Sequence, residues 1–154
     1  MRRSMLVLLA ALAAAAVVLT GCSSSSSSSS SAAVTPSSSA SGGGTITIGS
    51  DQANDHGTRD ATGKSSFEIE ADNDEGFYFD PTVLTGSANQ KITLEIKNEG
   101  TAQHNFSIVA QSVNVTIAPG SSQKVHVTFP ATGTVEFYCS FHRSLGMAGE
   151  LEVA

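Results

Sequence analysis

From residue 66 to the C-terminus, apolar and polar side chains alternate in short runs, and a period of two is typical of half-buried β-strands. The run KITLEIK over residues 91–97, for example, places Ile92, Leu94 and Ile96 on one face. The other runs cover residues 67–71, 77–79, 104–108, 113–117, 124–129, 134–139 and 149–153. Turn-forming residues separate the runs, and none has the period of a helix. The pattern predicts an all-β fold, an antiparallel β-sandwich of seven or eight strands.

The first 21 residues have the organisation of an export signal. A basic pair is followed by an apolar run over residues 5–18, which is shorter than the ~20 residues that span a membrane. The run ends in LTGC, which resembles the bacterial lipobox, and this resemblance implies cleavage before Cys22 and a lipid on its sulfur. We therefore expect residues 1–21 to be a lipoprotein signal peptide, with a plain secretory signal and a free Cys22 as the alternative.

Residues 22–65 are rich in serine and glycine and include nine consecutive serines. Such a composition cannot bury a core, so we interpret this segment as a flexible tether behind the lipidated Cys22, with one domain over residues 66–154. These features predict an exported protein that is anchored to the bacterial cell membrane or envelope by its N-terminal lipid.

The formal net charge of the whole chain is −6. Removing residues 1–21 takes away two of the eight basic side chains and none of the fourteen acidic ones, which leaves a net charge of −8. This charge argues against nucleic acid as a partner and favours encounter with a basic protein, although solubility alone is an equally good explanation.

The segment CSFHRSLGM brings Cys139, His142 and Met147 within nine residues of one another. The chain has only two cysteines, so a lipid on Cys22 would leave Cys139 without a disulfide partner in the chain. A lone cysteine in an exported protein must be buried, paired between chains or bound to a metal.

Strand alternation predicts where these side chains point. Cys139 shares a face with Phe137, and His104 shares a face with Phe106, so both should point inward at the end of a strand. His142 and Met147 fall in the loop that follows Cys139. The four side chains meet at one end of the sandwich only if strands 103–109 and 134–139 are neighbours.

Two imidazoles, a thiolate and a thioether are donors typical of a blue-copper site, whereas zinc gains little from methionine. Taken one at a time, each residue has a simpler explanation. Met147 could fill the core, Cys139 could be an inert buried thiol, and His104 could be a histidine that bonds within the core. Their joint spacing favours a metal.

The segment YCSFHRSLGMAGELEV resembles the C-terminal signature Cys-x-x-His-x-x-x-x-Met of the plastocyanin and pseudoazurin branch of the cupredoxins, over about residues 66–154. The resemblance implies a Greek-key β-sandwich with one mononuclear type 1 copper that passes single electrons. It makes His104 and His142 the nitrogen ligands, Cys139 the thiolate and Met147 the axial ligand.

The same resemblance assigns further roles. Asn105 matches a residue whose side chain ties the ligand loops together, and Tyr138 matches an aromatic residue that offers a second electron route. Phe141 stands where photosynthetic plastocyanins usually carry proline. Together with Leu145, Phe141 could surround the edge of His142 as an apolar docking patch for a redox partner, although Leu145 could instead only seal the site, and Tyr138 could simply be a surface residue.

The leading hypothesis is thus a monomeric, membrane-tethered electron carrier. An extracytoplasmic lipoprotein that buffers or delivers copper would use the same ligands and is the alternative. A copper enzyme is excluded because it needs more copper centres and more than the four histidines of this chain. A metal-free adhesive sandwich is the remaining possibility.

Overall fold

The computed structural model describes residues 43–154, which form twelve β-strands and two short 3-10 turns. In chain order the elements are β1 (Gly44–Ile48), β2 (Asp51–Asp55), β3 (Thr58–Asp60), β4 (Ser66–Asp72), β5 (Tyr78–Asp80), β6 (Val83–Gly86), β7 (Lys91–Asn98), β8 (His104–Ile108), η1 (Val109–Gln111), β9 (Val113–Ile117), β10 (Ser122–Thr128), β11 (Thr134–Tyr138), η2 (Arg143–Leu145) and β12 (Ala148–Val153).

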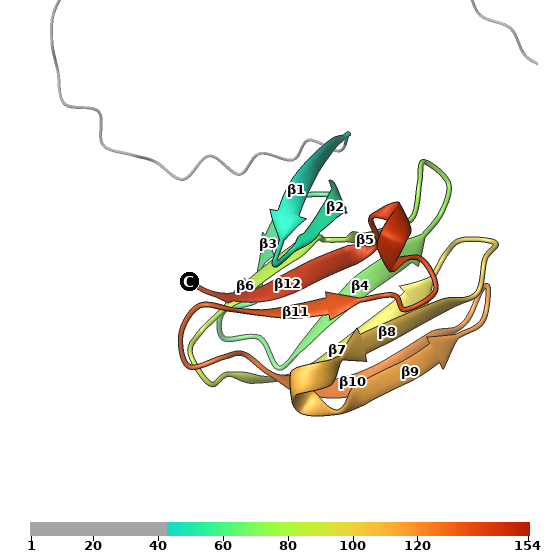
Figure 1. The fold of residues 1–154 in the computed structure, drawn as a ribbon. Helices are drawn as coiled ribbons and strands as arrows, with labels where there is room; N and C mark the ends of the chain where they lie inside the picture. The colour runs from blue at the N-terminus through green and yellow to red at the C-terminus, as the bar shows by residue number, and fades with distance from the viewer. Residues whose placement is uncertain (1–42) are drawn as a thin grey trace, which may run out of the picture. The chain divides into compact units, whose positions relative to one another are not determined.

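Two main sheets form a sandwich, which confirms the predicted all-β fold class (Figure 1). One sheet has the strand order β10-β7-β4-β5 and the other has the order β3-β6-β12-β11-β8-β9. Strands β1 and β2 form a separate antiparallel hairpin. The predicted alternation holds where it was clearest: in β7, Ile92, Leu94 and Ile96 are buried.

The predicted antiparallel pairing does not extend to three pairs of strands. β4 pairs with β7, β6 with β12, and β3 with β6, all in parallel. The chain leaves one sheet, crosses to the other and returns between these partners, and such crossover connections produce parallel neighbours. Alternation of side chains predicts which face a residue occupies, but it says nothing about the direction of the neighbouring strand.

The folded region also begins earlier than predicted. Residues 44–60, which we assigned to a flexible tether, form β1, β2 and β3. β3 completes one edge of the larger sheet, and the hairpin buries Ile48 and Ala53 against Val83 and Ala148. These polar sequences fold because a few apolar residues, Ile48 above all, pack against a neighbouring sheet, which composition alone does not reveal.

The predicted signal peptide, the lipid attachment at Cys22 and the serine run lie outside the described residues. Within residues 43–154, no helix has both the length and the apolar character needed to cross a membrane.

Three phenylalanine rings lie at the centre of the sandwich. Phe79, Phe106 and Phe137 are fully buried, and their ring centroids are 5.0, 5.3 and 5.7 Å apart. Two of the pairs meet edge to face, which is a favourable geometry for aromatic rings. Phe106 lies two residues after His104, and Phe137 lies two residues before Cys139, so the aromatic core anchors both strands that lead to the candidate ligands.

β8 and β11 are neighbours in the sheet, as convergence of the candidate ligands requires. They are hydrogen-bonded at one residue pair, Tyr138 with Ser107. Beyond that pair β11 ends and Cys139 follows, while β8 begins at His104. The ligand-bearing ends of the two strands therefore lie at the same end of the sandwich.

Candidate metal centre

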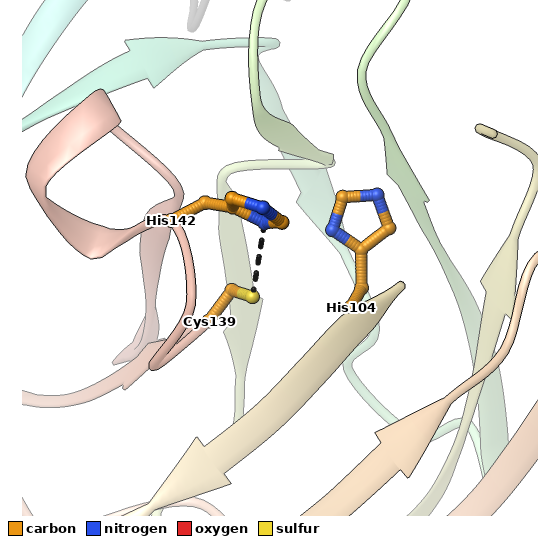
Figure 2. A group of neighbouring side chains, drawn as sticks. All are labelled: His104, Cys139 and His142. Atoms are coloured by element: carbon orange, nitrogen blue, oxygen red, sulfur yellow. Dashed lines mark hydrogen bonds between the residues drawn. The ribbon is translucent and has the colours of Figure 1, made fainter. Parts of the chain in front are cut away.

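Three of the predicted ligands come together in the structure. One potential ligand atom from each of His104, Cys139 and His142 lies within 4.8 Å of the others. Figure 2 shows the two imidazole rings and the thiol pointing toward one another, with His104 at the start of β8 and the other two on the loop after β11. The sulfur of Cys139 is 3.5 Å from Nδ1 of His142, and the two histidine rings are 5.1 Å apart.

Met147 lies on the same loop and is fully buried. The backbone N–H of Cys139 donates to the carbonyl of Met147 at 3.0 Å, and the N–H of Met147 donates to the carbonyl of His142 at 3.2 Å. These bonds close the loop on itself, so that the thiol, the imidazole and the thioether come from one compact turn.

His104 is fully buried, and neither of its ring nitrogens has a hydrogen-bond partner among the described residues. Burial, aided by the neighbouring His142, lowers the pKa of His104 to about 4. Burial also lowers the pKa of His142. Both rings are thus kept neutral at pH 7, with a nitrogen lone pair ready to bind a metal.

An unpartnered buried imidazole is costly unless something binds it. Here it faces a buried thiol and a second imidazole, with a buried thioether on the same loop. Two nitrogens, one sulfur anion and one weak sulfur donor form the set found in type 1 copper sites, and the residues present fit that ion.

Asn105 joins the two segments that carry the ligands, in the position that the resemblance implied. Its side-chain oxygen accepts a hydrogen bond from the backbone N–H of Ser140 at 3.0 Å and one from Ser107 Oγ at 2.8 Å. Its amide nitrogen donates to Asn114, and its backbone N–H donates to the sulfur of Cys139 at 3.3 Å. Such contacts orient metal ligands and hold them in place.

The predicted docking residues lie on the surface around His142, which is itself half-buried. Phe141 is 50% exposed and Leu145 is 55% exposed. The ring of Phe141 stands edge-on to that of His142, with their centroids 6.3 Å apart. Tyr138 differs from the other two, because it is half-buried against the β1–β2 hairpin and the guanidinium of Arg143 lies 4.1 Å from its ring centre.

Two residues beside the site were not predicted from the sequence. The ring of Phe77 stacks on that of His142, with a centroid distance of 3.9 Å and an angle of 16°. Asn54 in β2 bonds to the loop between His142 and Met147. Alternation grouped Phe77 with the core residue Phe79, and no local signal in the polar sequence around Asn54 indicated a distant partner.

Comparisons with known proteins agree with this geometry. The family described as "Cupredoxin-like domain" matches residues 10–153. Plastocyanin A/B of Petroselinum crispum is 31% identical over 90 residues, which are 52% of this chain and 91% of that protein.

Two solved structures are also similar. Dithionite-reduced auracyanin from the photosynthetic bacterium Roseiflexus castenholzii matches with a TM-score of 0.50 and 25% identity, over 59% of this chain and 98% of that one. Auracyanin A of Chloroflexus aurantiacus, described as a "blue" copper protein, matches with a TM-score of 0.46 and 27% identity, over 58% of this chain and 99% of that one.

Proposed function

This chain belongs to the cupredoxin-like domain family, and on that premise we propose that it carries single electrons through one type 1 copper while tethered to a membrane. The observation that carries the proposal is the meeting of His104, Cys139 and His142 within 4.8 Å, beside a buried Met147. The chain is an electron carrier like plastocyanin and auracyanin, and not an enzyme.

Copper would be held by two imidazoles, one thiolate and one weakly bound thioether, from His104, His142, Cys139 and Met147. When bound, it supplies a one-electron couple at this end of the sandwich. The protein's part is to bury the donors, to exclude water and to hold the ligand segments together through Asn105. Donors that are already in place need little rearrangement when the charge of the site changes.

Electrons would enter and leave by the exposed edge of His142. Phe141 and Leu145 offer an apolar contact area around that ring. Asp74 and Glu75 are exposed and shortly precede Phe77, which stacks on the same histidine. An apolar patch beside acidic side chains suits a redox partner with a basic rim.

The visible spectrum of the copper-loaded protein tests the proposed function. We expect one copper per chain, an intense visible band that disappears on reduction, and rapid electron exchange. A colourless protein with one bound copper would contradict the proposal. Sluggish electron exchange combined with fast copper loss to an acceptor would instead support the buffering or delivery function.

We further propose that Cys22 carries the lipid that anchors the protein at the bacterial cell envelope. A tether keeps a carrier at high local concentration near membrane-bound partners. In cell fractionation, the wild type should appear with the membranes and the C22A variant in the soluble fraction. Replacing Ser23 with alanine is the matched control and should leave the protein in the membranes. Equal distribution of wild type and C22A would refute the lipid anchor.

A further inference from the structure

The β1–β2 hairpin is a separate element that lies outside the two main sheets, beside β12 (Figure 1). Its strands pair along their full length, from Gly44 with Asp55 to Ile48 with Asp51. Ile48 and Ala53 are its buried anchors. One face of the hairpin is thus fixed to the sandwich, and β2 runs past the loop that carries His142 and Met147.

Asn54 in β2 makes three hydrogen bonds to backbone carbonyls beside the copper site. Its backbone N–H donates to Gly146 at 2.9 Å, and its side-chain amide donates to Leu145 at 3.0 Å. The same amide nitrogen donates to the carbonyl of Phe77 at 2.9 Å. One side chain therefore joins the ligand loop to the segment whose aromatic ring stacks on His142.

The ligand loop is shaped to fit closely against Asn54. Gly146 has a φ of +93°, a conformation that residues with side chains rarely adopt. A Cβ atom at this position would lie 2.8 Å from the amide nitrogen of Asn54. A side chain at position 146 would collide with Asn54, so the loop backbone can lie this close to β2 only because the residue is glycine.

A second link between the hairpin and the loop involves Arg143, at the start of η2. The guanidinium of Arg143 donates from Nε to Asp51 at 2.5 Å and from Nη2 to Glu136 at 2.8 Å. Asp51 begins β2, and Glu136 belongs to β11. Arg143 directly follows His142, so the ligand loop is held by β2 at both ends of η2.

We propose that Asn54 is a positioning residue for the copper site, and that the hairpin acts through it to fix the ligand loop and Phe77 relative to each other. This inference rests on the proposed function, because it concerns the same site. Residues that orient metal ligands from outside typically change metal affinity by about 10- to 100-fold when they are replaced. Asn54 holds the ligand backbone rather than a ligand side chain, so we expect the lower end of that range.

The decisive variant is N54D, which keeps the size of the side chain but removes both amide donors. Its backbone bond to Gly146 is retained. The matched control is Q52A in the same strand, because Gln52 is exposed and, among residues 43–154, its side chain bonds only to Thr47 of the hairpin. Hydrogen exchange of the metal-free protein and transfer of copper to a chelator should be measured for both variants.

In N54D, we expect faster exchange of the amides of residues 145–147, normal exchange in the hairpin, copper release about tenfold faster than in the wild type, and a shifted reduction potential. Q52A should match the wild type in all of these measurements. If N54D fails to fold, N54S decides the question, because a serine can keep at most one of the two side-chain bonds and should give a smaller change in the same direction.

The inference is overturned if folded N54D exchanges its amides and releases copper at the wild-type rates. If N54D does not fold, the same result in N54S overturns it. A blue wild type in that experiment would leave the proposed function standing. A colourless copper-loaded wild type would overturn the proposed function. In that case, hydrogen exchange of the metal-free protein still tests the positioning role. Wild-type exchange at residues 145–147 in N54D would overturn that role, and faster exchange in N54D would support it for the metal-free loop.

Discussion

Replacing Cys139 with serine should abolish the visible colour of the copper-loaded protein. The band of a blue copper site depends on a thiolate bound to the metal, and a serine hydroxyl is a hard donor that does not replace it. Cys139 is fully buried, and its sulfur accepts the N–H of Asn105. The loss should be complete, and the spectrum of the variant after copper addition checks it.

The control for this experiment is the neighbouring residue. S140A removes an exposed hydroxyl that makes no hydrogen bond within the described residues, and it leaves the backbone bond from Ser140 to Asn105 in place. It should be as blue as the wild type. Burying a hydroxyl in place of the thiol can lower the stability of the fold by about 1–3 kcal/mol. Circular dichroism must therefore show that C139S is folded. Colour in folded C139S would mean that the thiolate is not a ligand.

Shortening the chain to residues 66–154 should destabilise the domain strongly, whereas a chain of residues 43–154 should be as stable as the protein without its signal. The shorter chain loses β1, β2 and β3, and it uncovers Val83 and Ala148. Full burial of one side chain such as Ile48 alone contributes about 1.5–3 kcal/mol. The truncation should therefore lower the free energy of unfolding by several kcal/mol, out of the ~5–15 kcal/mol of a typical domain.

Backbone hydrogen bonds add to this effect. Ala61 donates to Thr85 at 2.8 Å, and Thr82 and Val83 both donate to the carbonyl of Gly57 at 3.1 Å. Without these partners, β6 becomes an open edge, which invites aggregation. Urea unfolding of the two metal-free chains checks the prediction. Equal unfolding midpoints would show that the first three strands do not contribute to stability.

Much of the sandwich could be predicted from alternation alone. The run at residues 91–97 became β7 with its apolar face inward, and the inward positions of His104 and Cys139 at strand ends were predicted in the same way. Alternation works here because each strand has one face on a single core.

Other features depend on contacts between distant parts of the chain. Asn54 is 91 residues from Leu145, and neither residue has a local signal for the other. The short strand β6 lies between two parallel partners that sequence cannot identify. Phe77 does pack against the core, as alternation predicted, but its stacking on the ring of His142 depends on the loop after β11, to which no local pattern points. In each case the missing information is which segments become neighbours.

A single residue pair joins β8 to β11, so the sheet is weakly paired at the end that carries the ligands. Next to the site, the regular ladder between these strands gives way to bonds made by one side chain, Asn105. Backbone ladders elsewhere keep the sandwich intact whatever occupies this end. A substitution at Asn105 should therefore change how the ligand segments are held, while the backbone pairing of the sandwich stays in place.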